Sequence, residues 1–125
     1  MAIVLIVDDS PDIHLLLGGW LTKMGHKIVR VDDGYNAVPA FSEHRPQLVF
    51  LDYHLPVSTG GQVYSRIREL DYGKTVPIVF ISAEPPSELM FVVPAGDPVR
   101  FLSKPVKEAA FRETILALLP PAPAS

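Results

Sequence analysis

Ala2–Val7 reads AIVLIV, an uninterrupted apolar run close to the start of the chain. Two later runs have the same character, LVFL at Leu48–Leu51 and IVFI at Ile78–Ile81. A strand that is apolar at every position suits a sheet covered on both faces, and such sheets are mostly parallel. The three runs therefore predict the central strands of a parallel sheet, and weaker strands are expected at Lys27–Val31 and Val99–Ser103.

Amphipathic segments alternate with these apolar runs. The clearest is Ile13–Met24, whose apolar residues recur with helical spacing after a capping Ser10 and before a terminating Gly25. Shorter helical patterns cover Val63–Leu70 and Phe111–Leu119. Strands that alternate with helices in this way predict an α/β domain with right-handed crossovers.

Prolines interrupt two of the expected helices. Pro39 falls inside the second helical segment, Gly34–His44, so this helix is expected to start late or to kink. The fourth helical segment is bounded by prolines at both ends, which leaves Ser87–Val93 as barely two turns. The fourth helix is therefore predicted to be shortened or distorted.

Composition excludes several classes of protein. With 11 Lys and Arg against 14 Asp and Glu, and no basic run, the chain is not expected to bind nucleic acid directly. It contains no cysteine, which excludes disulfides, thiolate catalysis and cysteine-ligated metals. No apolar run is long enough to span a bilayer and no export signal is evident, so a cytoplasmic protein is expected. Residues 1–119 are predicted to form one domain, followed by a Pro/Ala-rich tail or linker stub at 120–125.

Polar side chains stand where the predicted strands end. They are Asp8, Asp9, Asp52, Ser82 and Lys104. Because the carboxyl ends of parallel strands meet at one edge of a sheet, these side chains are expected to lie together. Neighbouring carboxylates raise one another's pKa, and a divalent cation relieves that repulsion. An all-oxygen cluster predicts Mg²⁺, with Mn²⁺ as the alternative.

The same set suits phosphoryl transfer. An aspartate carboxylate such as that of Asp52 can attack a phosphoryl group and hold it as an acyl phosphate. The reaction otherwise needs positioning and neutralisation of the phosphoryl oxygens. A metal ion, the Lys104 ammonium and the Ser82 hydroxyl could supply that neutralisation.

Four motifs now identify a family. They are IVDD at Ile6–Asp9, LDYHLPVSTGG at Leu51–Gly61, ISAE at Ile81–Glu84 and FLSKP at Phe101–Pro105. In this order they resemble the CheY-like receiver domain of bacterial two-component response regulators. The resemblance implies a flavodoxin-like (βα)5 fold, with a doubly wound parallel sheet of five strands in the order 2-1-3-4-5.

The resemblance also implies a role for each residue of the acidic site. Asp52 is similar to the phosphoacceptor and Asp9 to the direct Mg²⁺ ligand. Asp8 resembles the partner that acts on the metal largely through water, and the backbone carbonyl of His54 a further ligand. Lys104 is similar to the ion-pair partner, and its bond to Pro105 is expected to be cis.

Other residues are implied in switching and timing. Ser82 resembles the hydroxyl that follows the phosphoryl group, and Phe101 the aromatic residue that then turns inward. These changes would alter the face formed by the fourth helix, the last strand and the last helix. His54 and Glu84 flank the expected water path and should tune the lifetime of the acyl phosphate.

The implied function is a signalling switch rather than an enzyme, apart from its own phosphotransfer and autodephosphorylation. The donor would be a histidine kinase or a phosphotransfer protein, and the output a downstream effector protein or a covalently attached domain. Two alternatives remain: a receiver-like interaction module that is not phosphorylated, and a small phosphohydrolase with Asp52 as nucleophile. The other histidines, His14, His26 and His44, lack ligand spacing and are predicted to be surface or core residues.

Overall fold

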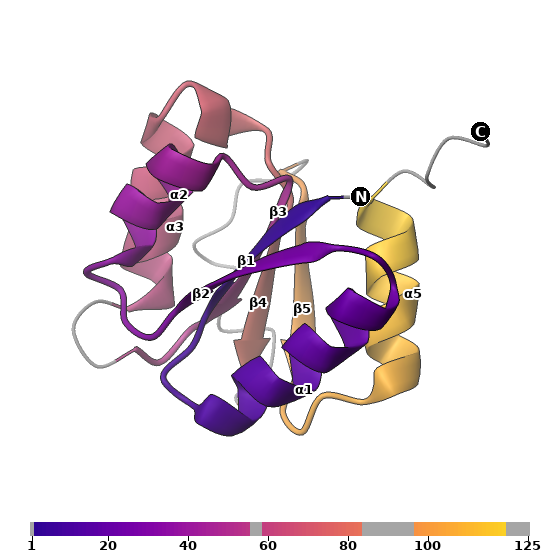
Figure 1. Ribbon diagram of the computed structural model, residues 1–125. Helices are drawn as coiled ribbons and strands as arrows, with labels where there is room; N and C mark the ends of the chain where they lie inside the picture. Colours follow the sequence, from indigo (N-terminus) through magenta and orange to yellow (C-terminus); the bar gives the residue numbers. More distant parts are fainter. Residues whose placement is uncertain (1, 56–58, 84–96, 120–125) are drawn as a thin grey trace, which may run out of the picture.

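The computed structural model describes residues 2–55, 59–83 and 97–119 of the chain and shows a single parallel sheet. Its five strands lie in the order β2-β1-β3-β4-β5 (Figure 1). They are β1 Ile3–Val7, β2 Lys27–Val31, β3 Leu48–Asp52, β4 Ile78–Ser82 and β5 Val99–Ser103. All four neighbouring pairs are parallel, so the strands, their direction and their predicted order are confirmed.

Burial explains why the apolar runs were informative. Every residue of β3 and β4 is buried, and so are the last four residues of β1. The edge strands β2 and β5 each include exposed residues, and only Val31 of β2 is buried, which accounts for their weaker patterns. Strands β3 and β4 each extend one residue beyond the apolar run, to Asp52 and Ser82. Both polar residues are therefore held by the sheet itself.

Four α-helices lie in the described part of the chain. They are α1 Pro11–Lys23, α2 Ala37–His44, α3 Gly60–Glu69 and α5 Glu108–Leu118, with a 3₁₀ turn, η1, at Tyr72–Lys74. Ser10 caps α1 as predicted, its hydroxyl accepting from the backbone N–H of Ile13 at 3.5 Å. Gly25 follows the helix with a positive φ of 87°, a conformation that costs glycine little.

The second helix starts late, as its proline predicted. It begins at Ala37, which places Pro39 in the first turn, where a missing N–H breaks no helical hydrogen bond. Helix α3 ends one residue before Leu70, which caps it. The predicted shortened fourth helix and the tail at 120–125 lie outside the described residues.

The helices cover the sheet on both faces, in the doubly wound arrangement of a flavodoxin-like fold. Helices α1 and α5 pack on one face and α2 and α3 on the other (Figure 1). On the α1 and α5 face, the Phe111 ring lies 5.2 Å from Phe50 and 5.0 Å from Trp20, centroid to centroid. Burying one such ring contributes about 1.5–3 kcal/mol. Two apolar layers thus hold the strand ends in fixed positions.

Within the described residues, no helix combines the length and the hydropathy that crossing a bilayer requires.

Candidate functional site

The structure brings three carboxylates to one edge of the sheet. Asp8 and Asp9 directly follow β1, and Asp52 ends β3, the strand paired with it. One carboxylate oxygen from each residue lies within 4.8 Å of the other two. Asp8 is fully buried and Asp52 is 3% exposed, whereas Asp9 is exposed. The cluster therefore has two buried carboxylates and one that is open to solvent.

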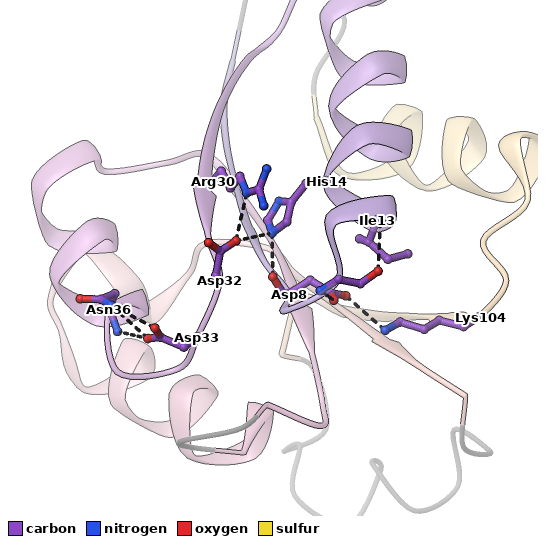
Figure 2. A network of polar contacts seen from close by, with 9 residues as sticks. Asp8, Ile13, His14, Arg30, Asp32, Asp33, Asn36 and Lys104 are labelled. Carbon is purple, nitrogen blue, oxygen red and sulfur yellow. Dashed lines mark hydrogen bonds and ion pairs between the residues drawn. The ribbon is translucent and has the colours of Figure 1, made fainter.

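Lys104, directly after β5, supplies a cation to the two buried carboxylates. Its Nζ is 3.2 Å from Asp8 Oδ2 and 3.5 Å from Asp52 Oδ2 (Figure 2 shows the contact with Asp8). The backbone N–H of Lys104 donates to the carbonyl of Ser82 at 3.0 Å, which ties the residue to the end of β4. The Lys104–Pro105 bond is cis, the geometry that the resemblance implied.

Backbone groups orient both buried carboxylates. Asp8 Oδ1 accepts from the N–H of Ser10 at 2.8 Å, just before α1. Asp52 Oδ1 accepts from the N–H of His54 at 3.1 Å, in the loop after β3. In each residue the other oxygen, Oδ2, is the one that faces Lys104.

The electrostatics of the site leave an excess of negative charge. Burial raises the pKa of Asp52, and the nearby Asp8 raises it further, while the His54 N–H and Lys104 oppose the shift. Asp8 Oδ2 is buried and accepts no hydrogen bond from the described residues, although Lys104 lies close to it. Three clustered carboxylates, with one ammonium beside two of them, suit a hard divalent cation with oxygen ligands. The residues present therefore fit Mg²⁺.

Gly60 lets the next helix approach this edge. As the first residue of α3, it donates its N–H to the Tyr53 carbonyl at 2.8 Å. A Cβ at this position would lie 2.6 Å from the Asp52 carbonyl oxygen and 2.7 Å from Tyr53 Cα. Both atoms belong to the backbone next to the candidate nucleophile, so they cannot rotate away. Only glycine permits this contact.

We expect Gly60→Ala to lower the free energy of unfolding by about 2 kcal/mol, because the added methyl overpacks against backbone. Gly61→Ala is the matched control, since its Cβ would lie 3.7 Å or more from its neighbours. An alanine at this helical position is expected to leave stability unchanged or to raise it by up to about 1 kcal/mol. Urea unfolding of the two variants checks the prediction, and equal midpoints would contradict it.

The remaining predicted residues lie in different surroundings. Ser82 is buried at the end of β4, on the same edge as Asp52. Phe101, in β5, is half-buried and stacks on Phe80 with ring centroids 5.8 Å apart, so it packs against the α2 and α3 side of the core. The His54 ring meets Tyr53 edge-on at 5.3 Å. Glu84 lies outside the described residues.

His14 is a residue of this neighbourhood that sequence reasoning did not place there. It was predicted as an ordinary surface or core histidine, and it is indeed buried, but its Nε2 lies 2.7 Å from the backbone oxygen of Asp8. A polar residue beside the apolar stripe of α1, one turn after Ser10, was the available signal. That signal marks burial and does not indicate which backbone group the ring meets.

Comparison with known proteins identifies the family of this chain. Residues 4–116 match the response regulator receiver domain family. The sensor histidine kinase GacS of Pseudomonas protegens is 31% identical over 116 residues, which are 90% of this chain and 13% of GacS. The chain thus spans a small part of that relative.

Two solved structures are similar over nearly their whole length. The chemotaxis protein CheY4 of Vibrio cholerae superposes with a TM-score of 0.87 at 28% identity, covering 95% of this chain and 99% of CheY4. The receiver domain of the sensor histidine kinase PA1611 of Pseudomonas aeruginosa, described with a magnesium ion in its active site cleft, has a TM-score of 0.81 at 27% identity. It covers 94% of this chain and 96% of that domain. The chain therefore belongs to the response regulator receiver domain family and has a CheY-like fold.

Proposed function

We propose that this chain is a phosphorylation-activated signalling switch in which Asp52 accepts a phosphoryl group. The observation that carries the proposal is the meeting of the Asp52 carboxylate with Asp8, Asp9 and Lys104 at one sheet edge. A buried carboxylate flanked by a cation and further acidic ligands is suited to attack a phosphoryl group and to hold it. The donor would be a histidine kinase or a phosphotransfer protein, met in the cytoplasm.

Mg²⁺ would be held by Asp8, Asp9, Asp52 and the carbonyl of His54. When bound, it would neutralise charge on a phosphoryl oxygen and on the cluster itself. The magnesium ion of the PA1611 receiver domain supports this assignment. The excess of carboxylates over ammonium groups at the acidic site of this chain supports the assignment independently.

The transfer step follows from how Asp52 is held. A carboxylate oxygen of Asp52 attacks phosphorus, and the bond from phosphorus to the donor's leaving group breaks, with its electron pair going to the leaving group. The His54 N–H fixes the carboxylate through Oδ1, and the Lys104 ammonium faces Oδ2. Lys104 and the Ser82 hydroxyl would stabilise the phosphoryl oxygens after transfer.

Propagation of the signal would use Ser82 and Phe101. A phosphoryl group on Asp52 would draw the Ser82 hydroxyl towards it, since the two residues end adjacent strands. Phe101 stacks on Phe80 in β4, the strand that ends at Ser82. A shift of this pair would change the exposed side of β5 and bias a two-state equilibrium. His54 and Glu84 would set the lifetime of the acyl phosphate, and an effector protein or attached domain would receive the signal.

Phosphorylation by a small donor tests the proposal directly. The protein is incubated with Mg²⁺ and acetyl phosphate, and intact mass is expected to show one added phosphoryl group. Asp52→Asn, or chelation of the metal, is expected to abolish the adduct. Asp71→Asn is the matched control: it removes the same charge from a fully exposed side chain and should be phosphorylated normally.

The folding of Asp52→Asn separates loss of chemistry from loss of structure. Because the folded-state pKa of Asp52 is raised, its ionised form is less favourable in the folded than in the unfolded chain. Stability therefore falls as the pH rises through this pKa, and a neutral Asn should be at least as stable at pH 7.

The phosphorylation experiment also distinguishes the two alternative functions. No adduct on the wild type would favour an unphosphorylated interaction module, and turnover of phosphoesters without an intermediate would favour a hydrolase.

A further inference from the structure

We propose that His14 is a positioning residue for the acidic site, acting through the backbone of Asp8. This inference rests on the proposed function insofar as Asp8 holds the metal. His14 lies in the first turn of α1 and is 6% exposed. Its ring points at the loop that carries Asp8, between α1 and the end of β2 (Figure 2).

The hydrogen bond of His14 defines which nitrogen carries the proton. Nε2 lies 2.7 Å from the Asp8 backbone oxygen, and a carbonyl oxygen can only accept, so Nε2 must donate. Nδ1 is buried and has no hydrogen-bond partner among the residues that the structure describes. Among the described residues, the ring is therefore hydrogen-bonded through Nε2, and this nitrogen contacts the backbone of Asp8.

A second acceptor, the carboxylate of Asp32, also contacts His14 Nε2. Asp32 Oδ1 lies 3.3 Å from His14 Nε2 and also accepts from Arg30 Nε at 2.9 Å. Arg30 lies in β2 and Asp32 directly follows this strand, which neighbours β1 in the sheet. His14 thus connects α1, the residue after β1 and the end of β2, as the dashed contacts of Figure 2 show.

With this bond, every polar group of Asp8 has a contact. Its N–H donates to the Val31 carbonyl at 3.1 Å, and its carbonyl accepts from His14. Its Oδ1 accepts from the Ser10 N–H, and its Oδ2 faces Lys104. The first two contacts fix the peptide planes on either side of Cα, and these determine where the carboxylate points. Removing the donor of His14 leaves a buried carbonyl unsatisfied beside the metal position.

We therefore expect loss of the Nε2 donor to weaken Mg²⁺ binding. Changes to groups that orient metal ligands typically reduce affinity by about 10–100-fold. For His14→Asn we expect a Kd for Mg²⁺ about tenfold higher than in the wild type, at the low end of that range, because Asp52 keeps its contacts with His54 and Lys104. The rate of phosphorylation by acetyl phosphate should recover towards the wild-type value at saturating Mg²⁺.

Two amide variants at His14 are equally polar but differ in whether the side-chain nitrogen reaches the Asp8 carbonyl. The side-chain nitrogen of His14→Gln extends about as far as Nε2 and can donate to the Asp8 carbonyl, whereas that of His14→Asn is too short. Leu15→Asn, at the next and exposed position of α1, controls for the effect of Asn on the helix. Isothermal titration of the full chain with Mg²⁺ is expected to show weak binding for His14→Asn alone. Urea unfolding confirms that each variant is folded.

The outcomes distinguish this inference from the proposed function. Mg²⁺ binding by His14→Asn within about twofold of wild type, or failure of a folded His14→Gln to restore affinity, overturns the role of His14. Wild type that binds Mg²⁺ but is not phosphorylated overturns the function and leaves the role of His14 standing. Should His14→Asn not fold, ¹⁵N NMR of the wild-type imidazole decides: the Nε2–H tautomer is expected, and the Nδ1–H tautomer overturns the inference.

Discussion

Arg68→Met is expected to lower the free energy of unfolding by about 3 kcal/mol, because it leaves the almost buried carboxylate of Asp97 without its cation. Arg68 is on α3, and Asp97 lies two residues before β5. Nε and Nη2 of the guanidinium are 3.1 and 2.9 Å from the two carboxylate oxygens of Asp97. The side chains are only 13% and 11% exposed, so water cannot replace the lost partner well.

Further contacts make the Arg68 site specific for a guanidinium. Nη1 donates to the carbonyls of Gly73 and Val76, at 2.8 and 2.7 Å, in the segment between α3 and β4. The Tyr64 hydroxyl donates to Asp97, and burial, followed by its contact with Asp97, raises the pKa of Tyr64. The Arg68 guanidinium also lies 5.2 Å from the Tyr64 ring centroid. The segment before β4 and the start of β5 are thus joined to one helix.

Urea unfolding measures the effect against Arg112→Met. Arg112 pairs with Glu108 on the surface of α5, with both side chains more than half exposed. The same substitution there should cost less than about 0.5 kcal/mol, as exposed helical pairs contribute little. Equal midpoints for the two variants would show that the Arg68 contacts do not stabilise the fold. A double variant, Arg68→Met with Asp97→Leu, should recover part of the loss, since it leaves no unpaired charge.

The Arg68 and Asp97 pair also shows where prediction from sequence ended. The strands were predictable because burial on both faces demands an apolar residue at every position, as in β3 and β4. The meeting of Asp8, Asp52 and Lys104 was predictable because parallel strands bring their carboxyl ends together. Each of these steps uses a local pattern or a rule of topology.

Contacts between side chains of distant segments follow no such rule. Arg68 and Asp97 are 29 residues apart, and nothing near either residue marks the other as its partner. The bond from His14 to Asp8 depends on how α1 is rotated against β1, and helical spacing identifies the buried face of α1 without fixing that rotation. The packing of Phe101 on Phe80 needed the register between β4 and β5, which pairs the two residues directly.

Lys104→Met is expected to change two properties of the acidic site in opposite directions. Removing the ammonium leaves Asp8 and Asp52 without their cation, so the site becomes more negative and should bind Mg²⁺ more tightly. Unit charges 4 Å apart interact by about 4 kcal/mol at the effective dielectric of a protein surface, and about 1.4 kcal/mol is already tenfold in affinity. We therefore expect a Kd for Mg²⁺ at least about tenfold lower than that of the wild type.

Phosphorylation of the same variant should be slower. An ammonium that neutralises a phosphoryl oxygen acts where charge develops, and losing one such donor costs about 100-fold in rate. Titration with Mg²⁺, followed by the rate with acetyl phosphate at saturating metal, measures both effects on one sample. Lys74→Met, at a lysine whose side chain is 59% exposed, should change neither.

Opposite signs make this variant informative, because a partly unfolded protein would lose both metal binding and phosphorylation. Weaker Mg²⁺ binding by a folded Lys104→Met would mean that Lys104 serves mainly to hold Asp8 and Asp52 in place. Tighter binding with an unchanged rate would mean that the ammonium opposes the metal and takes no part in transfer. Tighter binding with slower transfer is the one result that follows if the cation at 3.2 and 3.5 Å from the two carboxylates also meets the phosphoryl group.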